Sequence, residues 1–233
     1  MVKVKVRNIL LVEGKDEQFV IPFFMDNFVV WGEKKADWIV EIKEFDGIEN
    51  LLKSGVIEAE LKAPGLHAVG IIIDANDSFD ARWDRVKERC GKVVGGLPEG
   101  LPSGGLIVVN DYGLRVGVWI MPDNKTRGML ETFLSYLLEP ERQMLWKYAK
   151  NVCDGAKRFD GTYTNSHRDK AYVFTYLAFI EPPGLSLQSS VLQHAFDARL
   201  PLADHFVRWF IELYQLQPRQ PAPAISQANP PSA

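Results

Sequence analysis

The chain has 233 residues, of which 46% are hydrophobic and 24% are charged, and its net charge is −3. This composition is typical of a globular protein with a sizeable core, and it excludes a global basic field that would hold nucleic acid without a local basic patch. No stretch has the apolar length of a membrane span, and two cysteines are too few for a zinc cluster or a disulfide framework. We therefore expect a cytoplasmic protein with reduced thiols and no membrane contact.

The chain opens with a predicted strand over residues 2–12, whose last part, Ile9 to Val12, is uniformly apolar. Glu13 and Gly14 follow it, and the pattern becomes helical from Asp16 onward. This predicts a buried strand that ends near Glu13, a tight turn and a helix. Pro22 lies inside the helical pattern, so we expect the helix to begin late or to bend there.

Two further strands and a hairpin are predicted before residue 122. Residues 38–45 alternate apolar and charged side chains, which is typical of a strand with one covered face, and a helix broken near Gly55 follows. His67 to Ile73 is the most apolar strand and is predicted to lie in the middle of the sheet. After a helix over residues 79–89 and a glycine-rich loop, the hairpin signal Asn110-Asp111-Tyr112-Gly113 separates strands at 106–109 and 114–121.

The second half of the chain has a helical pattern only. Helices are predicted at residues 141–152, 169–180, 189–196 and 203–216, and a proline-rich stretch follows them. We therefore expect an α/β domain over residues 1–138 with a mostly parallel sheet and flanking helices. A helical extension, residues 139–217, would pack on it, and residues 218–233 would form a disordered tail.

Acidic side chains follow two of the predicted strands. Glu13 and Glu17 follow the first, and Asp74, Asn76 and Asp77 follow or end the central one. Because the carboxyl ends of parallel strands meet at one edge of a sheet, these side chains are expected to converge if the two strands are parallel neighbours. The structural alternative is that Glu17 complements the positive end of its helix and Glu13 is a solvated loop residue.

A third acidic motif contains Glu131, in the first turn of a helix that is predicted to start near Met129 after the polar loop 122–128. Glu131 either complements the helix dipole or forms a third carboxylate facing Glu13 and Asp74. The loop carries Lys125 and Arg127, which would neutralise the charge of a phosphate beside a metal site. Lys170, at a polar helix start, is either a surface lysine or a residue that reaches the acidic crevice.

These motifs resemble those of the Toprim domain, which is shared by topoisomerases, primases and the overcoming-lysogenization-defect nucleases. The Glu-x-x-x-Glu spacing of Glu13-Gly14-Lys15-Asp16-Glu17 is similar to the first motif of the nuclease branch, and Gly128-Met129-Leu130-Glu131 is similar to its third. The resemblance covers Lys3 to Leu138 and implies a Toprim-like, Rossmann-like fold. One departure is Asn76, which stands at the second acid of the Asp-x-Asp motif and is followed directly by Asp77.

The acids and the resemblance together predict a site for Mg²⁺ or Mn²⁺, since these cations prefer oxygen ligands. The predicted ligands are Glu13, Glu17, Asp74, Asn76, Asp77 and Glu131. Glu13 and, by resemblance to the nucleases, Lys170 are assigned catalytic roles. Phosphate binding is assigned to Lys15, Lys125 and Arg127.

The resulting hypothesis is a metal-dependent phosphoryl-transfer enzyme, a nuclease that hydrolyses phosphodiester bonds of DNA or RNA. The first alternative is a degenerate Toprim-like binding or regulatory module without catalysis, which is motivated by Asn76 and by the negative net charge. The second is a hydrolase of small phosphorylated molecules. The sequence leaves the substrate and the number of metal ions open, and a homo-oligomer is compatible with each hypothesis.

Overall fold

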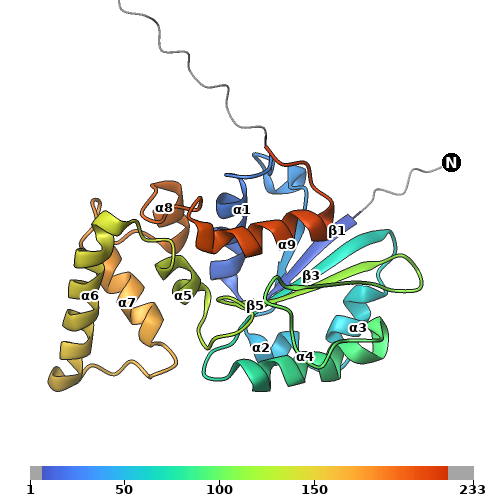
Figure 1. Cartoon of the computed structure of the whole chain (residues 1–233), viewed down its shortest axis with the longest axis horizontal. Helices are drawn as coiled ribbons and strands as arrows, with labels where there is room; N and C mark the ends of the chain where they lie inside the picture. Colours follow the sequence, from blue (N-terminus) through green and yellow to red (C-terminus); the bar gives the residue numbers. More distant parts are fainter. Residues whose placement is uncertain (1–6, 220–233) are drawn as a thin grey trace, which may run out of the picture.

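The computed structural model describes residues 7–219, apart from the side chains of Lys92 and Val93. Its centre is a five-stranded sheet with the order β2-β1-β3-β5-β4, in which β2, β1, β3 and β5 are parallel and β4 pairs antiparallel with β5. Helices cover both faces of the sheet, and the helices α6 and α7 extend the molecule to one side (Figure 1). The class predicted from the sequence, α/β with a mostly parallel sheet and flanking helices, is confirmed.

The elements follow one another with short connections. The strands are β1 (Arg7–Val12), β2 (Glu41–Glu44), β3 (Leu66–Asp74), β4 (Leu106–Val109) and β5 (Arg115–Met121). The α-helices are α1 (Lys15–Met25), α2 (Ile48–Leu51), α3 (Val56–Leu61), α4 (Phe79–Val94), α5 (Leu130–Ser135), α6 (Gln143–Ala156), α7 (Arg168–Leu177), α8 (Leu187–Leu192) and α9 (Asp204–Tyr214). Short 3₁₀ turns lie at η1 (Lys35–Asp37), η2 (Pro140–Arg142), η3 (Lys157–Phe159) and η4 (Pro201–Ala203).

Most predicted elements are found, with shifted ends. Strand β3 lies in the middle of the sheet, as its apolar sequence predicts, and the 106–121 hairpin is confirmed as β4 and β5. The second strand is shorter than predicted, and β1 ends at Val12, one residue before Glu13. Helix α1 begins at Lys15 and continues through Pro22, so the expected late start is wrong. Residues 1–6 of the first predicted strand lie outside the described part of the chain.

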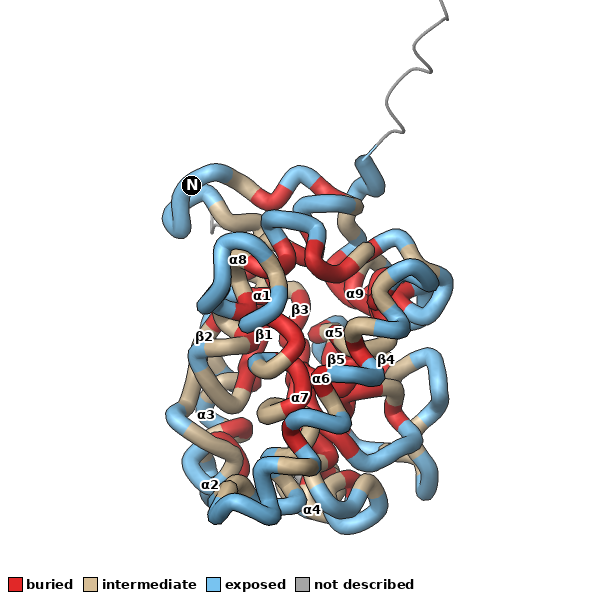
Figure 2. The backbone as a smooth tube through the Cα atoms, turned by 90° about the vertical axis from the view of Figure 1, so that its left-hand side faces the viewer, coloured by how far each residue is buried: buried red, intermediate tan, exposed pale blue. Residues whose placement is uncertain are grey.

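The strands divide their side chains between two hydrophobic cores. Alternate residues of a strand point to opposite faces, and Leu10 and Val12 of β1 belong to one core while Ile9 and Leu11 belong to the other. The second core is closed by α2, α3 and α4. Because both faces are covered, strands β1, β3 and β5 are buried almost throughout (Figure 2).

Helix α9 lies directly on the sheet. Its Trp209 Nε1 donates a hydrogen bond to the carbonyl oxygen of Leu106 at 2.9 Å, and its Tyr214 hydroxyl donates to the carbonyl oxygen of Ile9 at 2.8 Å. The backbone can approach this closely because glycines stand beneath the helix: a Cβ atom at Gly117 would lie 2.6 Å from Leu213 Cδ2. A Cβ atom at Gly70 would clash with the Tyr214 hydroxyl.

Gly117→Ala is expected to destabilise the protein by about 1 to 3 kcal/mol, because the added methyl group overpacks the contact between α9 and the sheet. Urea denaturation followed by tryptophan fluorescence measures the change. Gly104→Ala is the matched control, since a Cβ atom there meets no heavy atom within 4 Å. Equal stability of the two variants would contradict this account of how α9 packs.

The helical second half shares its core with the sheet. One hydrophobic cluster contains Leu10 and Ile72 from the strands together with Phe133, Trp146 and Phe206 from α5, α6 and α9. This core therefore contains residues from both sides of residue 138, the predicted end of the α/β domain. Residues 220–233, most of the predicted tail, lie outside the described part of the chain, and no helix of the described residues is long and apolar enough to cross a membrane.

Candidate functional site

The predicted acids meet at the carboxyl-terminal edge of the parallel strands. Strands β1 and β3 are parallel neighbours, with Val12 paired to Ile72. Glu13 directly follows β1 and Asp74 ends β3, and the backbone N–H of Asp74 donates a hydrogen bond to Glu13 Oε1 at 2.8 Å. The prediction that these two strand ends lie together is therefore confirmed.

Glu17 is held over the same edge by the first turn of α1. Its Oε2 atom accepts a hydrogen bond from the backbone N–H of Gly14 at 3.1 Å, and only 6% of the residue is exposed. Gly14 has extended backbone dihedral angles, which is the conformation that an N-cap residue adopts. Glu17 is thus both a first-turn acid that complements the helix dipole, as the structural alternative holds, and a buried member of the acidic group.

Glu131 joins the group through the start of α5. The backbone N–H of Leu130 donates a hydrogen bond to Asp74 Oδ1 at 3.0 Å, so the first turn of α5 is fixed to the end of β3. Glu131, the next residue, is 2% exposed. The loop before α5 is held to the same strand end by two backbone hydrogen bonds between Asn76 and Gly128, at 2.7 and 3.0 Å.

Lys170 brings a positive charge to the acids from α7. Its Nζ lies 2.9 Å from Glu131 Oε1 and 3.0 Å from Asp16 Oδ2. A hydrogen bond of 2.6 Å from the Thr132 hydroxyl to Asp169 Oδ2 ties the starts of α5 and α7 together beside it. Lys170 therefore reaches the acidic crevice and is not a free surface lysine.

Burial raises the pKa of each of the four central acids, and repulsion between members of the group adds to this effect at Glu17 and Asp74. Desolvation is the largest cause for Glu13, Glu17, Asp74 and Glu131, because burial disfavours the charged form. The negative charges of Glu13 and Glu131 add to this effect at Glu17, whose pKa rises to about 7. The pKa of Asp74 is raised well above its ordinary value by desolvation and by Glu17, Glu13 and Glu131.

In three of the acids, one carboxylate oxygen accepts a hydrogen bond from a backbone N–H group. Glu13 Oε1, Glu17 Oε2 and Asp74 Oδ1 each accept from a backbone N–H. For the second oxygen of these carboxyl groups, no hydrogen bond is found within residues 7–219. In the part of the chain that the structure describes, no three His, Cys, Asp or Glu side chains are already arranged to hold a metal ion. The acids are therefore gathered at one edge of the sheet, but within residues 7–219 they do not form a ready-made metal site.

The other predicted site residues lie around this group. Asn76, Asp77 and Arg127 line a small recess of about 20 Å³, together with Asn165 and Ser166 before α7 and with Arg168 and Asp169 in its first turn. Asn76 adopts a left-handed conformation with φ of 51°. Asp77 is exposed, whereas the acids of the central group are mostly buried.

The predicted phosphate-binding side chains are exposed. Lys15 lies in the first turn of α1, and Lys125 and Arg127 lie in the loop after β5. Two polar neighbours in that loop stabilise the loop itself: Asp123 Oδ1 accepts from the backbone N–H groups of Lys125 and Thr126, and the buried Asn124 accepts from the N–H of Ile120 at 2.7 Å. Lys125 and Arg127 are thereby displayed on an ordered turn.

Sequence reasoning missed the role of Asp16 as the second carboxylate beside Lys170. The residue is part of the Glu-Gly-Lys-Asp-Glu motif, so its position was visible, but its partner lies 154 residues away. The Thr132–Asp169 contact was missed for the same reason. Only the three-dimensional structure, in which α7 packs against α5 and Lys170 reaches Asp16 of α1, reveals these pairs.

Comparison with known proteins identifies a family and no function. No curated protein matches the chain, and no solved structure matches it. One family model, described as "Protein of unknown function (DUF3226)", matches residues 7–215. Because this match covers most of the 233 residues, the chain belongs to the DUF3226 family.

Proposed function

We propose that this protein is a Toprim-like, Mg²⁺- or Mn²⁺-dependent phosphoryl-transfer enzyme, and specifically a nuclease that hydrolyses phosphodiester bonds. The observation that carries the proposal is the gathering of four acids from distant parts of the chain at one edge of a parallel sheet. Ligands bind at this edge in open α/β sheets, because the loops that leave the strands form a crevice there.

The donor set suits a hard divalent cation. Glu13, Glu17, Asp74 and Glu131 offer carboxylate oxygens, and these are the ligands that Mg²⁺ and Mn²⁺ prefer. Backbone N–H groups fix one oxygen of the first three, and rotation of the side chains would direct the second oxygens to one ion. A cation would also relieve the repulsion that helps to raise the pKa values of Glu17 and Asp74. We place Asn76 and Asp77 as outer ligands, at the rim of the same crevice.

The bound ion would act as a Lewis acid that polarises a phosphoryl oxygen. Proton transfer, charge stabilisation and phosphate binding are assigned to residues of the chain. Glu13 is the proposed acceptor of the proton that the attacking water loses. Lys170 would offer an ammonium group to the negative charge that develops on the phosphoryl oxygens. Lys15, Lys125 and Arg127 would hold the phosphates of the substrate from the exposed rim.

Cleavage assays test the proposal. Purified protein is incubated with plasmid DNA and with single-stranded DNA in Mg²⁺ or Mn²⁺, beside Glu13→Gln and Asp74→Asn. We expect cleavage by the unchanged protein and none by either variant, because each variant removes a charged ligand and keeps the size of the side chain. Exposed Glu141→Gln is the matched control and should cleave normally.

Two results would count against the proposal. Cleavage that survives in both variants would place the activity elsewhere. Calorimetric titration that shows no Mg²⁺ or Mn²⁺ binding, even at millimolar concentrations, would favour the alternative of a binding module without catalysis. A screen of small phosphoesters in the same buffer separates a nuclease from a small-molecule phosphohydrolase.

A further inference from the structure

The segment 142–168 carries a charge opposite to that of the rest of the chain. It contains six Lys and Arg residues and two acids, a net charge of +4, although the whole chain has a net charge of −3. This segment comprises α6, the turn η3 and the connection to α7. One of its acids is already engaged, since Asp154 Oδ1 accepts a hydrogen bond from the Tyr172 hydroxyl at 2.6 Å. A local basic region of the kind that the overall charge requires for polyanion binding is therefore present.

Helix α6 uses only one side to pack. Its buried residues, Trp146, Ala149 and Cys153, follow helical spacing and face α7 and the core. The opposite side is exposed and mixes charge with large apolar groups. We define the α6 face as Met144, Lys147 and Tyr148 on this side of α6, together with Arg158 and Phe159 of the exposed turn η3 that follows the helix.

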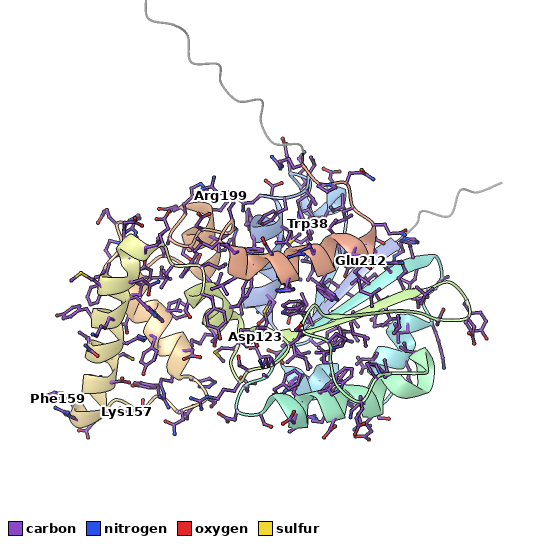
Figure 3. The ribbon with its side chains drawn as sticks, viewed as in Figure 1. Trp38, Asp123, Lys157, Phe159, Arg199 and Glu212 are labelled. Carbon is purple, nitrogen blue, oxygen red and sulfur yellow. The ribbon has the colours of Figure 1, made fainter. Side chains whose placement is uncertain are left out.

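The apolar side chains of the α6 face are unusually exposed for their size. Met144 is 86% exposed and Phe159, in η3, is 85% exposed. Tyr148 is 58% exposed and lies beside Phe179, with ring centroids 5.7 Å apart. Figure 3 shows Phe159 and Lys157 at the lower end of α6, at the outer edge of the molecule. Aromatic rings that alternate with basic side chains on an open surface suit single-stranded nucleic acid, because bases stack on the rings while phosphates pair with the cations.

The same segment leads to the candidate metal site. From η3 the chain runs through Asn165 and Ser166, which line the recess beside Arg127, to Lys170, which lies 2.9 Å from Glu131. The segment that carries the α6 face therefore continues along the chain to residues beside the acids. Duplex DNA fits less well, since its bases are stacked inside and would leave the exposed rings without partners.

We propose that the α6 face binds single-stranded nucleic acid and delivers it to the acidic site. This inference rests on the proposed function, whose substrate it narrows from any phosphodiester to an unpaired strand. Binding to the face needs no metal and no catalysis. It can therefore be measured separately from cleavage.

Fluorescence anisotropy of a labelled oligothymidine of about 16 nucleotides, in EDTA, tests the proposal. Lys147→Gln/Arg158→Gln is compared with Lys53→Gln/Lys62→Gln, which changes the net charge equally at exposed sites just after α2 and α3. We expect weaker binding and a flatter salt dependence for the first pair only, because each lost phosphate contact lowers the logarithmic salt slope by about 0.7.

A second pair of variants tests the contribution of the exposed aromatic rings to binding. Phe159→Ala is expected to weaken oligothymidine binding roughly 5- to 100-fold through lost stacking. Tyr112→Ala, at a ring that is 95% exposed in the β4–β5 turn, should bind normally. Circular dichroism checks that each variant is folded. Binding by wild type with the expected losses supports the inference even if no cleavage is found, and in that case only the proposed activity fails.

Three outcomes would overturn the inference. The first is equal binding by all four variants and the unchanged protein. The second is tighter binding of a duplex than of the single strand. The third is no binding of the oligothymidine at low salt; if it is accompanied by self-association that Tyr148→Ala abolishes, the α6 face is a contact between two copies of this chain.

Discussion

Replacing Glu17 by Gln is expected to stabilise the metal-free protein at about pH 8 by about 3 kcal/mol and to change little at about pH 4.5. The reason is the pKa of Glu17, which burial and the neighbouring acids raise from 4.5 to about 7. A raised pKa means that the folded protein holds this proton more tightly than the unfolded chain does. The associated stability is fully present below the unfolded pKa of 4.5, and it is lost as the pH rises through 7.

The Glu17→Gln side chain keeps an oxygen for the N–H of Gly14 but carries no charge, so its contribution does not depend on pH. The difference between the two proteins therefore isolates one group from the other titrations of the chain. Urea denaturation in EDTA, followed by the fluorescence of the six tryptophans, gives both free energies of unfolding at each pH. The control is Glu139→Gln, at an exposed glutamate. Stability curves of wild type and Glu17→Gln that stay parallel between about pH 4.5 and 8 would contradict the buried acidic group.

Periodicity and apolar runs predict most of the fold, and the packing of α9 shows where they stop. The pattern of residues 203–216 correctly predicts a helix with one buried side. It does not say what that side is buried against, because any apolar surface satisfies the same pattern. In the structure, α9 lies on the sheet directly over Gly70 of β3 and Gly117 of β5. Glycines within strands were the only sequence signal for such a close approach.

The site residues also fall into those whose position a sequence rule predicts and those whose position depends on tertiary packing. Glu13 and Asp74 were predicted to meet because parallel neighbours end at one edge, a rule that depends only on strand order. For Glu17 and Glu131 the sequence allows two explanations, because a first-turn acid looks the same in the sequence whether it is solvated or buried. Lys170 approaches Asp16 and Glu131 only because α7 packs beside α1 and α5, and no local pattern encodes that placement.

Lys170→Met is expected to destabilise the protein by about 2 kcal/mol at about pH 8 and by much less at about pH 5. The substitution removes the cation beside Glu131, whose pKa is already raised by desolvation and is lowered by Lys170. Without that ammonium, the pKa of Glu131 rises further in the folded protein. Following the same sign rule, the stability linked to its proton is lost as the pH rises, so the damage grows toward alkaline pH.

The size of the effect follows from the burial of the two partners. Removing one member of a fully buried pair costs about 3 to 5 kcal/mol, but 40% of the Lys170 side chain is exposed and water screens the pair. The bond to Asp16, which is 46% exposed, adds little, and Asp16→Asn should therefore be nearly silent.

The double variant Lys170→Met/Glu131→Gln separates loss of the ion pair from loss of packing. A neutral amide in place of the Glu131 carboxylate needs no counter-charge, so we expect the double variant to regain most of the stability at about pH 8 and to lose the pH dependence. Lys147→Met, at an exposed lysine of α6, controls for the change of side chain. If Lys170→Met were equally destabilising at both pH values, and Glu131→Gln gave no recovery, Lys170 would act through the packing of its aliphatic chain, and its charge would not balance the acidic group.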